Sequence, residues 1–209
     1  MNITIVFFIG LVIGMIGVIP PGLLNMTAAK ISLKDGYNRG VIFSVGVCVV
    51  VIAQTYIAMV LGEYLTLHPG VVEILQRVAL VLFVLITIYF LVIANKNETP
   101  KINPKISSIH SRFFQGMFMS ALNMFPIPFH AYMTVTLSSW GWLNFEPSSI
   151  ASYVAGVASG TFAMLYVYIF FFDKIKGKAL TSQKNMNLII GGITGVISLI
   201  TFINILKDL

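Results

Sequence analysis

Two short segments contain the residues whose types and spacing could do chemistry in this chain. The first is Ile19-Pro20-Pro21-Gly22-Leu23-Leu24-Asn25, inside a charge-free apolar run, and the second is Asn123-Met124-Phe125-Pro126-Ile127-Pro128. Proline lacks the N–H that the helical ladder needs, and its ring clashes with the carbonyl one turn back. Because lipid cannot satisfy the freed polar groups, such a break persists only where protein or a water-filled cavity surrounds it. Each segment therefore marks a candidate binding site.

The chemistry available at such breaks is the binding of an anionic group by backbone N–H groups. New half-helices are expected to begin after Gly22 and after Pro128, with their N-termini pointing into the membrane from opposite faces. A helix N-terminus carries roughly half a positive charge and unpaired N–H groups. Two converging N-termini could receive a carboxylate without any lysine or arginine inside the bilayer.

The predicted substrate-binding residues form or flank the breaks, together with one histidine: Pro20, Pro21, Gly22, Asn25, Asn123, Pro126, Pro128 and His130. The two asparagines could bond a ligand or only the freed backbone. His130 lies in an apolar run, where an ionisable side chain is costly and functional by default. It could bind substrate or carry a coupling proton, or it could be a neutral histidine bonded to a neighbouring helix. Four further residues could line the same cavity: Gln54, Tyr56, Tyr153 and Tyr166.

The composition places these residues in a membrane protein. Hydrophobic residues make up 57% of the chain and charged residues only 10%, against about 25% charged in soluble domains. The net charge of +6 lies in short loops between apolar runs, so it predicts membrane orientation and no nucleic-acid partner. Cys48 is the only cysteine, so no internal disulfide can form.

Six apolar runs approach the roughly 20 residues that a membrane span needs. They cover residues 3–27, 41–61, 78–94, 113–138, 150–172 and 188–206. We therefore predict an all-α integral membrane fold with about six transmembrane helices, the first and fourth broken at prolines. The first run has no preceding positive residue and exceeds a signal core of about 7–15 residues, so we expect a retained span.

The distribution of lysine and arginine predicts the orientation. These residues concentrate in the loops after the first, third and fifth spans, which places those loops in the cytoplasm and both termini outside. Three spans in each half then make two inverted repeats. The predicted organisation is a first three-helix repeat over 1–95, a cytoplasmic linker over 96–112 and a second three-helix repeat over 113–209.

Pairs of glycines four residues apart recur in the predicted spans. They are Gly10 with Gly14, Gly156 with Gly160, and Gly191 with Gly195. Small residues at this spacing let helix backbones approach closely in a membrane. The pairs could pack helices within one subunit or form the seam of a homodimer.

Several motifs resemble the LysE/RhtB family of amino-acid exporters, the LysE-type translocators. The residues concerned are Pro21-Gly22, Gly36-Tyr37-x-x-Gly40, the stretch from Phe114-Gln115 to Asn123, and Gly191-Gly192-x-x-Gly195. The chain departs from the family where Leu23 follows Pro20-Pro21-Gly22, and where no lysine follows Pro126 or Pro128. The resemblance implies proton-driven export of a small amino acid or similar metabolite across the bacterial cytoplasmic (inner) membrane.

Absent residue types narrow the alternatives. No aspartate or glutamate lies in the core of a predicted span, which disfavours a divalent-metal exporter. No nucleophile with a base is visible, so we expect neither an enzyme nor a cofactor. The expected partners are a small-molecule substrate, a proton and the lipid bilayer. The alternative is a non-transport accessory or assembly membrane protein on the same scaffold.

If His130 binds substrate or carries the coupling proton, replacing it changes the pH dependence of export. We expect His130→Ala and His130→Gln to lose that dependence, because neither side chain titrates near neutral pH. Export measured across a pH series checks this. Unchanged transport in both variants would remove the hypothesis.

Overall fold

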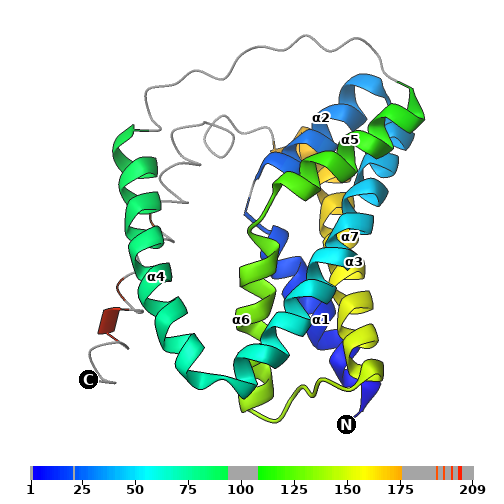
Figure 1. The fold of residues 1–209 in the computed structure, drawn as a ribbon. Helices are drawn as coiled ribbons and strands as arrows, with labels where there is room; N and C mark the ends of the chain where they lie inside the picture. The colour runs from blue at the N-terminus through cyan, green and yellow to red at the C-terminus, as the bar shows by residue number, and fades with distance from the viewer. Residues whose placement is uncertain are drawn as a thin grey trace. The chain divides into compact units, whose positions relative to one another are not determined.

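The computed structural model describes residues 2–20, 22–93 and 108–175, together with residues 192, 195, 199, 202 and 203. The described segments are helical and contain no strand, which confirms the all-α class for this part of the chain. The helices are α1 (Ile3–Val18), α2 (Leu23–Asp35), α3 (Tyr37–Leu67), α4 (Pro69–Ile88), α5 (Ile109–Leu122), α6 (Pro126–Ser139) and α7 (Pro147–Ile175), with a π-helical turn η1 (Tyr89–Ile93) after α4 (Figure 1).

Among the described residues, two helices are long and apolar enough to cross a membrane. These are α3 and, within α7, the segment Pro147–Phe171. The pair α1 and α2, bent by 79° at its break, would make a third span. The predicted sixth span at 188–206 lies almost entirely outside the described residues, so the six-span repeat remains a prediction.

Contacts divide the chain into two compact units. The main unit comprises Met1–Leu67 and Pro104–Ile175, and the second comprises His68–Asn103 and Lys176–Leu209. The main unit therefore holds α1, α2, α3, α5, α6 and α7, while α4 and η1 belong to the second unit. Each unit takes segments from both predicted repeats. The two compact units therefore do not correspond to the two predicted repeats.

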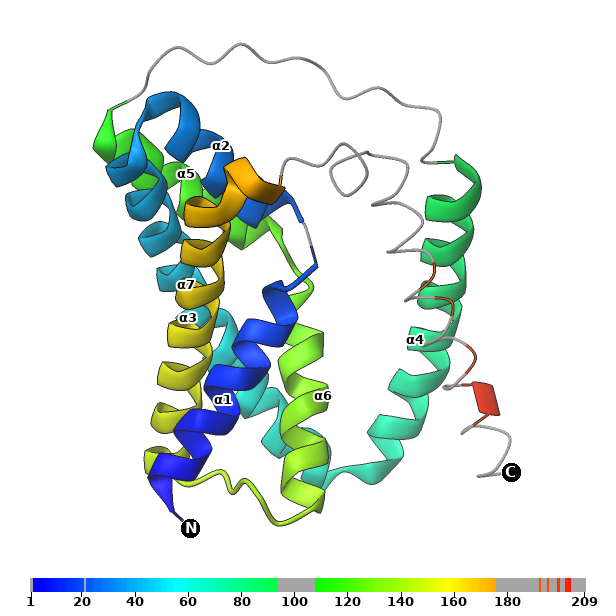
Figure 2. The same cartoon turned by 180° about the vertical axis from the view of Figure 1, so that it is seen from behind.

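In the main unit, the first half of each broken span packs against a long helix from the other predicted repeat. Helix α1 lies along α7, and α5 lies along α3, while α3 and α7 also contact each other (Figures 1 and 2). The two long helices therefore form a frame, and each carries one half of a broken helix on its side.

Glycines bring α1 and α7 close together. A Cβ at Gly10 would lie 2.5 Å from the Tyr153 carbonyl oxygen, and one at Gly14 would overlap the backbone of Val157. From the other side, Gly156 and Gly160 face the backbone of α1 in the same way. These four glycines pack helices inside the chain, as small residues do in membranes. Gly191 lies outside the described residues, and a homodimer seam remains an open prediction.

The α3–α5 contact uses the same device. Gly46 on α3 faces the backbone at Phe113, and Gly116 on α5 faces the backbone at Phe43. Ser120, four residues after Gly116, is fully buried and continues this small face. In each of the two contacts, small residues on both helices face the backbone of the other helix. The first halves of the broken spans, α1 and α5, therefore pack closely against the long helices α7 and α3.

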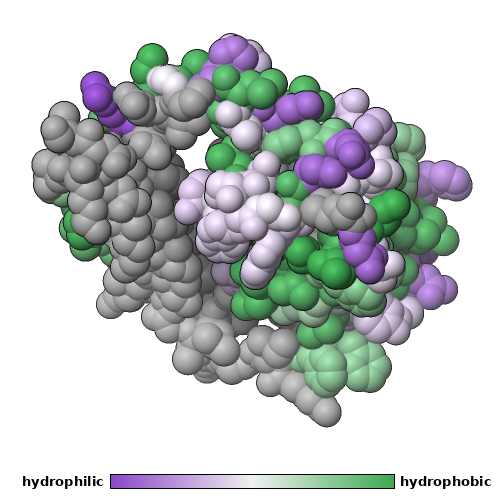
Figure 3. All heavy atoms as spheres, turned by 90° about the horizontal axis from the view of Figure 1, so that it is seen from below, coloured by the Kyte–Doolittle hydropathy of each residue, from purple (hydrophilic) through white to green (hydrophobic). Residues whose placement is uncertain are grey.

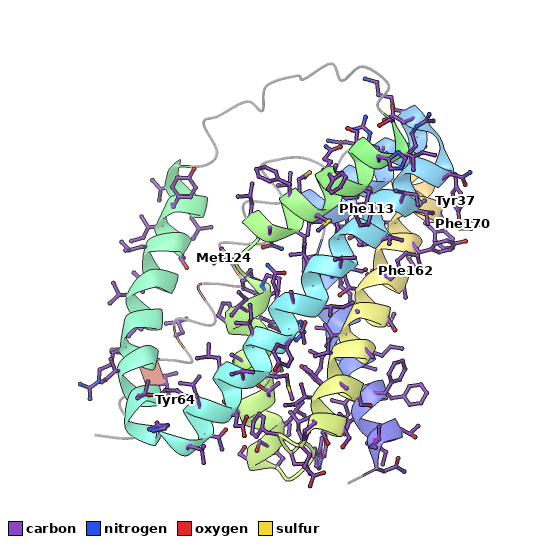
Figure 4. The ribbon with its side chains drawn as sticks, turned by 45° about the vertical axis from the view of Figure 1, so that its right-hand side comes forward. Tyr37, Tyr64, Phe113, Met124, Phe162 and Phe170 are labelled. Carbon is purple, nitrogen blue, oxygen red and sulfur yellow. The ribbon has the colours of Figure 1, made fainter. Side chains whose placement is uncertain are left out.

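The outer faces of the main unit are apolar. On α1 the residues Ile5, Phe8, Val12 and Ile16 are each at least half exposed. Tyr37, Phe162 and Phe170 project outward from α3 and α7 in Figure 4. In the end view of Figure 3, hydrophilic residues form separate patches among apolar ones. Exposed apolar surface of this extent is typical of a face that meets lipid or a protein partner.

The close α1–α7 contact predicts intolerance of one added methyl group. We expect Gly160→Ala and Gly156→Ala to lower the free energy of unfolding by about 1–3 kcal/mol, the usual cost of overpacking. Thermal denaturation in detergent measures this. The matched control is Gly70→Ala in α4, where no described atom lies within 4 Å of the added Cβ. Equal stability of the three variants and the parent would contradict the close contact.

Candidate functional site

The first break lies between α1 and α2. Helix α1 ends at Val18, and α2 begins at Leu23 with Gly22 as its N-cap, as predicted. Pro20 is exposed at the break, and Pro21 lies outside the described residues. The chain bends between Val18 and Leu23, and the carbonyls of Ile19 and Pro20 lie outside the two helices.

Asn25 satisfies the backbone of the first break. Its Nδ2 donates to the carbonyls of Val18 and Pro20, each at 2.9 Å. Its Oδ1 accepts from the N–H of Gly22 at 2.6 Å and from that of Met26 at 2.9 Å. The side chain is also buried, at 2% exposure. Both amide hydrogens are used by the backbone, so the structure favours the structural role of Asn25 over a ligand role.

Tyr168 of α7 completes this break. Its hydroxyl donates to the carbonyl of Ile19 at 2.7 Å, across 149 residues of sequence. Three successive carbonyl positions, at Val18, Ile19 and Pro20, are therefore bonded by two side chains. The described carbonyls that precede the bend are therefore hydrogen-bonded.

The second break lies between α5 and α6. Helix α5 ends at Leu122, with Asn123 as its C-cap, and α6 begins at Pro126. The prediction that this half-helix begins only after Pro128 is wrong. The first N–H groups of a helix have no intrahelical partner, so proline is tolerated there. Pro126 and Pro128 occupy the first and third positions of α6, where each removes an N–H that an anion could use.

Gln54 of α3 bonds two carbonyls at the second break. Its Nε2 donates to the carbonyl of Ser120 at 3.1 Å and to that of Asn123 at 2.8 Å. Its Oε1 and the hydroxyl of Ser120 are buried, with no partner among the described residues. This break therefore keeps polar atoms that a bound molecule or water could satisfy.

The two breaks are supported in a reciprocal way. Tyr168 comes from α7, which packs along α1, and Gln54 comes from α3, which packs along α5. Each long helix thus both holds the first half of one broken span and bonds a carbonyl where that half ends. The frame positions both breaks.

A small cavity of about 60 Å³ lies between the two breaks. Its lining is mostly apolar and aromatic, and comes from α1, α2, α3, α6, α7 and the second break: Gly14, Gly17, Val18, Leu24, Val47, Val51, Asn123, Phe125, Pro126, Phe129, His130, Thr161 and Leu165. Three predicted site residues, Asn123, Pro126 and His130, are among these. Pro20 and Pro128 are instead exposed. The main-unit fold therefore brings the two breaks to one cavity.

His130 reaches this cavity from α6 and is 4% exposed. Its Nδ1 lies 3.2 Å from the hydroxyl oxygen of Tyr153 on α7, and its ring meets that of Phe129 edge-on at 5.0 Å between centroids. This is the geometry of a histidine bonded to a neighbouring helix. A role in binding substrate or a proton stays a prediction.

Of the other residues expected near the cavity, Gln54 and Tyr153 do not line it, but each bonds a residue that does, Asn123 and His130 respectively. Tyr56 is 56% exposed and Tyr166 40% exposed, and the Tyr166 ring packs edge-on against Tyr37 at the surface. Sequence analysis missed Thr161 in the lining and Tyr168 at the first break. No local pattern distinguishes Tyr168 from Tyr166, because both lie in the same apolar run.

No family model, no curated protein and no solved structure matches this chain. The resemblance to LysE-type exporters therefore rests on the quoted motifs alone.

Removing the side chains that bond the breaks is expected to destabilise the protein. Asn25→Ala and Gln54→Leu should each lower the free energy of unfolding by about 1–3 kcal/mol for every buried group left unpaired. Tyr168→Phe should cost about 1 kcal/mol. Thermal denaturation in detergent checks these values. Tyr132→Phe, exposed on α6, is the control and should be neutral within about 0.5 kcal/mol. A neutral Asn25→Ala would show that other groups satisfy the first break.

Proposed function

We propose that this chain is a secondary transporter that moves a small metabolite across a membrane by alternating access. The observation that supports this most directly is the convergence of two broken helices on one cavity. Non-helical backbone at membrane depth is tolerated where it lines a cavity, and transporters use such breaks to bind substrates. The main unit has two breaks of this kind, side by side.

The frame suggests which parts move. Helices α3 and α7 are continuous, whereas α1 with α2 and α5 with α6 can each bend at a break. The cavity of about 60 Å³ is far smaller than the roughly 300–1,000 Å³ of typical ligand pockets. We therefore interpret this conformation as a closed one, in which substrate enters after one set of half-helices moves away from the other.

The lining indicates the substrate class. It offers Asn123, Thr161 and His130 among apolar and aromatic groups, and no charged residue is among its described members. Leu24 brings the first turn of α2 to the cavity, so a carboxylate could face that N-terminus. This supports an amino acid or a related small metabolite. Export, proton coupling and location in the bacterial cytoplasmic membrane, with both termini outside, follow from the resemblance and the loop charges.

A second candidate is a non-transport accessory or assembly protein. The observations in its favour are that Asn25 and Tyr168 bond the carbonyls of Val18, Ile19 and Pro20 at the first break, and that the cavity is small. The exposed apolar faces of α1 and α5 could then meet a protein partner. The two candidates differ in whether the cavity must open.

Metabolite profiling of cells with and without the protein tests transport. We expect one or more small amino acids or related metabolites to accumulate outside producing cells, and Gly17→Leu to abolish this by filling the cavity. Ala121→Leu introduces the same side chain at an exposed position on α5 and should behave like the parent. An unchanged profile in producing cells, or equal activity of the two variants, would favour the accessory candidate.

A further inference from the structure

A buried ion pair joins α2 to α5. Asp35 is the last residue of α2 and Arg112 the fourth residue of α5, and their side chains are only 1% and 6% exposed. The Nη2 of Arg112 donates to Oδ2 of Asp35. Its Nη1 donates to Oε1 of Gln115 at 2.5 Å, while Nη1 of Arg39 donates to the backbone carbonyl of Asp35 at 2.6 Å. The pair links residues 77 positions apart, Asp35 in the first predicted repeat and Arg112 at the end of the predicted cytoplasmic linker.

The ion pair lies at one end of the main unit, on one side of the two breaks that border the cavity. Helices α2 and α5 lie together at the upper end of the main unit in both Figure 1 and Figure 2, while α1 and α6 extend to the other end. The ion pair therefore ties together the two half-helices that lie on one side of the breaks. Lys30 and Lys34 of α2 and Arg39 of α3 lie in the stretch predicted from sequence as a cytoplasmic loop, so this is the end predicted to face the cytoplasm.

Helix electrostatics do not explain the pair. Asp35 lies at the negative C-terminal end of its helix and Arg112 close to the positive N-terminal end of its own, so each charge is disfavoured by the helix that carries it. A buried ion pair is also weak support for stability, because desolvation offsets much of the attraction. Each charge is instead compensated by the other one, across the contact between α2 and α5.

The ion pair forms only one of its two possible hydrogen bonds. A guanidinium and a carboxylate can form two parallel hydrogen bonds. Here Oδ1 of Asp35 and Nε of Arg112 are buried with no partner among the described residues. A contact that is locally opposed and incompletely bonded holds two helices together and can still be released.

We propose that Asp35 and Arg112 form an ionic latch that closes the cytoplasmic path to the cavity. Release of the latch separates the end of α2 from the start of α5 and exposes the cavity to that side. The proposal rests on the transport function proposed above, because only a cavity that opens needs a latch. If the two residues only stabilised the fold, replacing them would leave access to the cavity unchanged.

Access can be measured without knowing the substrate. Thr161 is 4% exposed and lines the cavity, so Thr161→Cys in a Cys48→Ala background provides one buried thiol there. Its rate of labelling by a membrane-impermeant maleimide is measured in inside-out and right-side-out vesicles. We expect Asp35→Asn to raise the labelling rate about tenfold in inside-out vesicles only. This corresponds to a loss of about 1.4 kcal/mol from the free energy that favours the closed state over the open one.

Two further variants separate a latch from a folding defect. Asp35→Asn combined with Arg112→Gln leaves no buried charge unpaired and should show the same rise, if the single variant gives no monodisperse protein. The exchange of both residues, Asp35→Arg with Arg112→Asp, restores an opposite-charge pair and should return the rate to the parent value. Lys34→Gln, an exposed change on the same helix, is the matched control and should label like the parent.

A parent-like labelling rate in the folded neutral variants would overturn the latch, as would a charge exchange that does not restore closure or a rise only in right-side-out vesicles. No substrate is present in this assay. An unchanged metabolite profile with altered labelling would therefore count against the transport function alone, and unchanged labelling with active transport against the latch alone.

Discussion

The rest of the structure depends on the need to hydrogen-bond every peptide group that a broken helix releases in an apolar surrounding. Lipid offers no partner, and an unpaired buried group is expensive. The chain meets this need with side chains. Asn25 and Tyr168 bond the carbonyls before the first bend, and Gln54 bonds those before the second. These residues therefore stabilise both breaks.

Side chains can reach the breaks only if the helices lie close together, and the glycines provide this. Gly14 and Gly160 bring α1 against α7, while Gly46 and Gly116 bring α3 against α5. The close approach lets a tyrosine or a glutamine on a long helix bond a carbonyl at the end of its neighbour. Small residues along a contact and a hydrogen-bonding residue near its end thus work as one unit, twice in the same chain.

The small cavity and the proposed latch suggest how a stable arrangement could still move. The bonds at each break come from the frame and from the break itself, so they can persist while α2 and α5 separate at their far ends. There, the contact depends on a charge pair that is half made. In the proposed transporter, the hydrogen bonds that stabilise the breaks and the ion pair that is released therefore lie in different parts of the structure, which fits alternating access around a fixed site.

The sequence by itself determined the helical class, the apolar segments and both breaks, because composition and proline chemistry act locally. It located Asn123, Pro126 and His130, which line the cavity. Only tertiary structure decided that Asn25 bonds backbone, that Tyr168 and not Tyr166 reaches the first break, and that α6 begins at Pro126. It also paired Asp35 with Arg112. Such contacts join residues far apart in the chain, and their geometry depends on how helices pack, which no local pattern encodes.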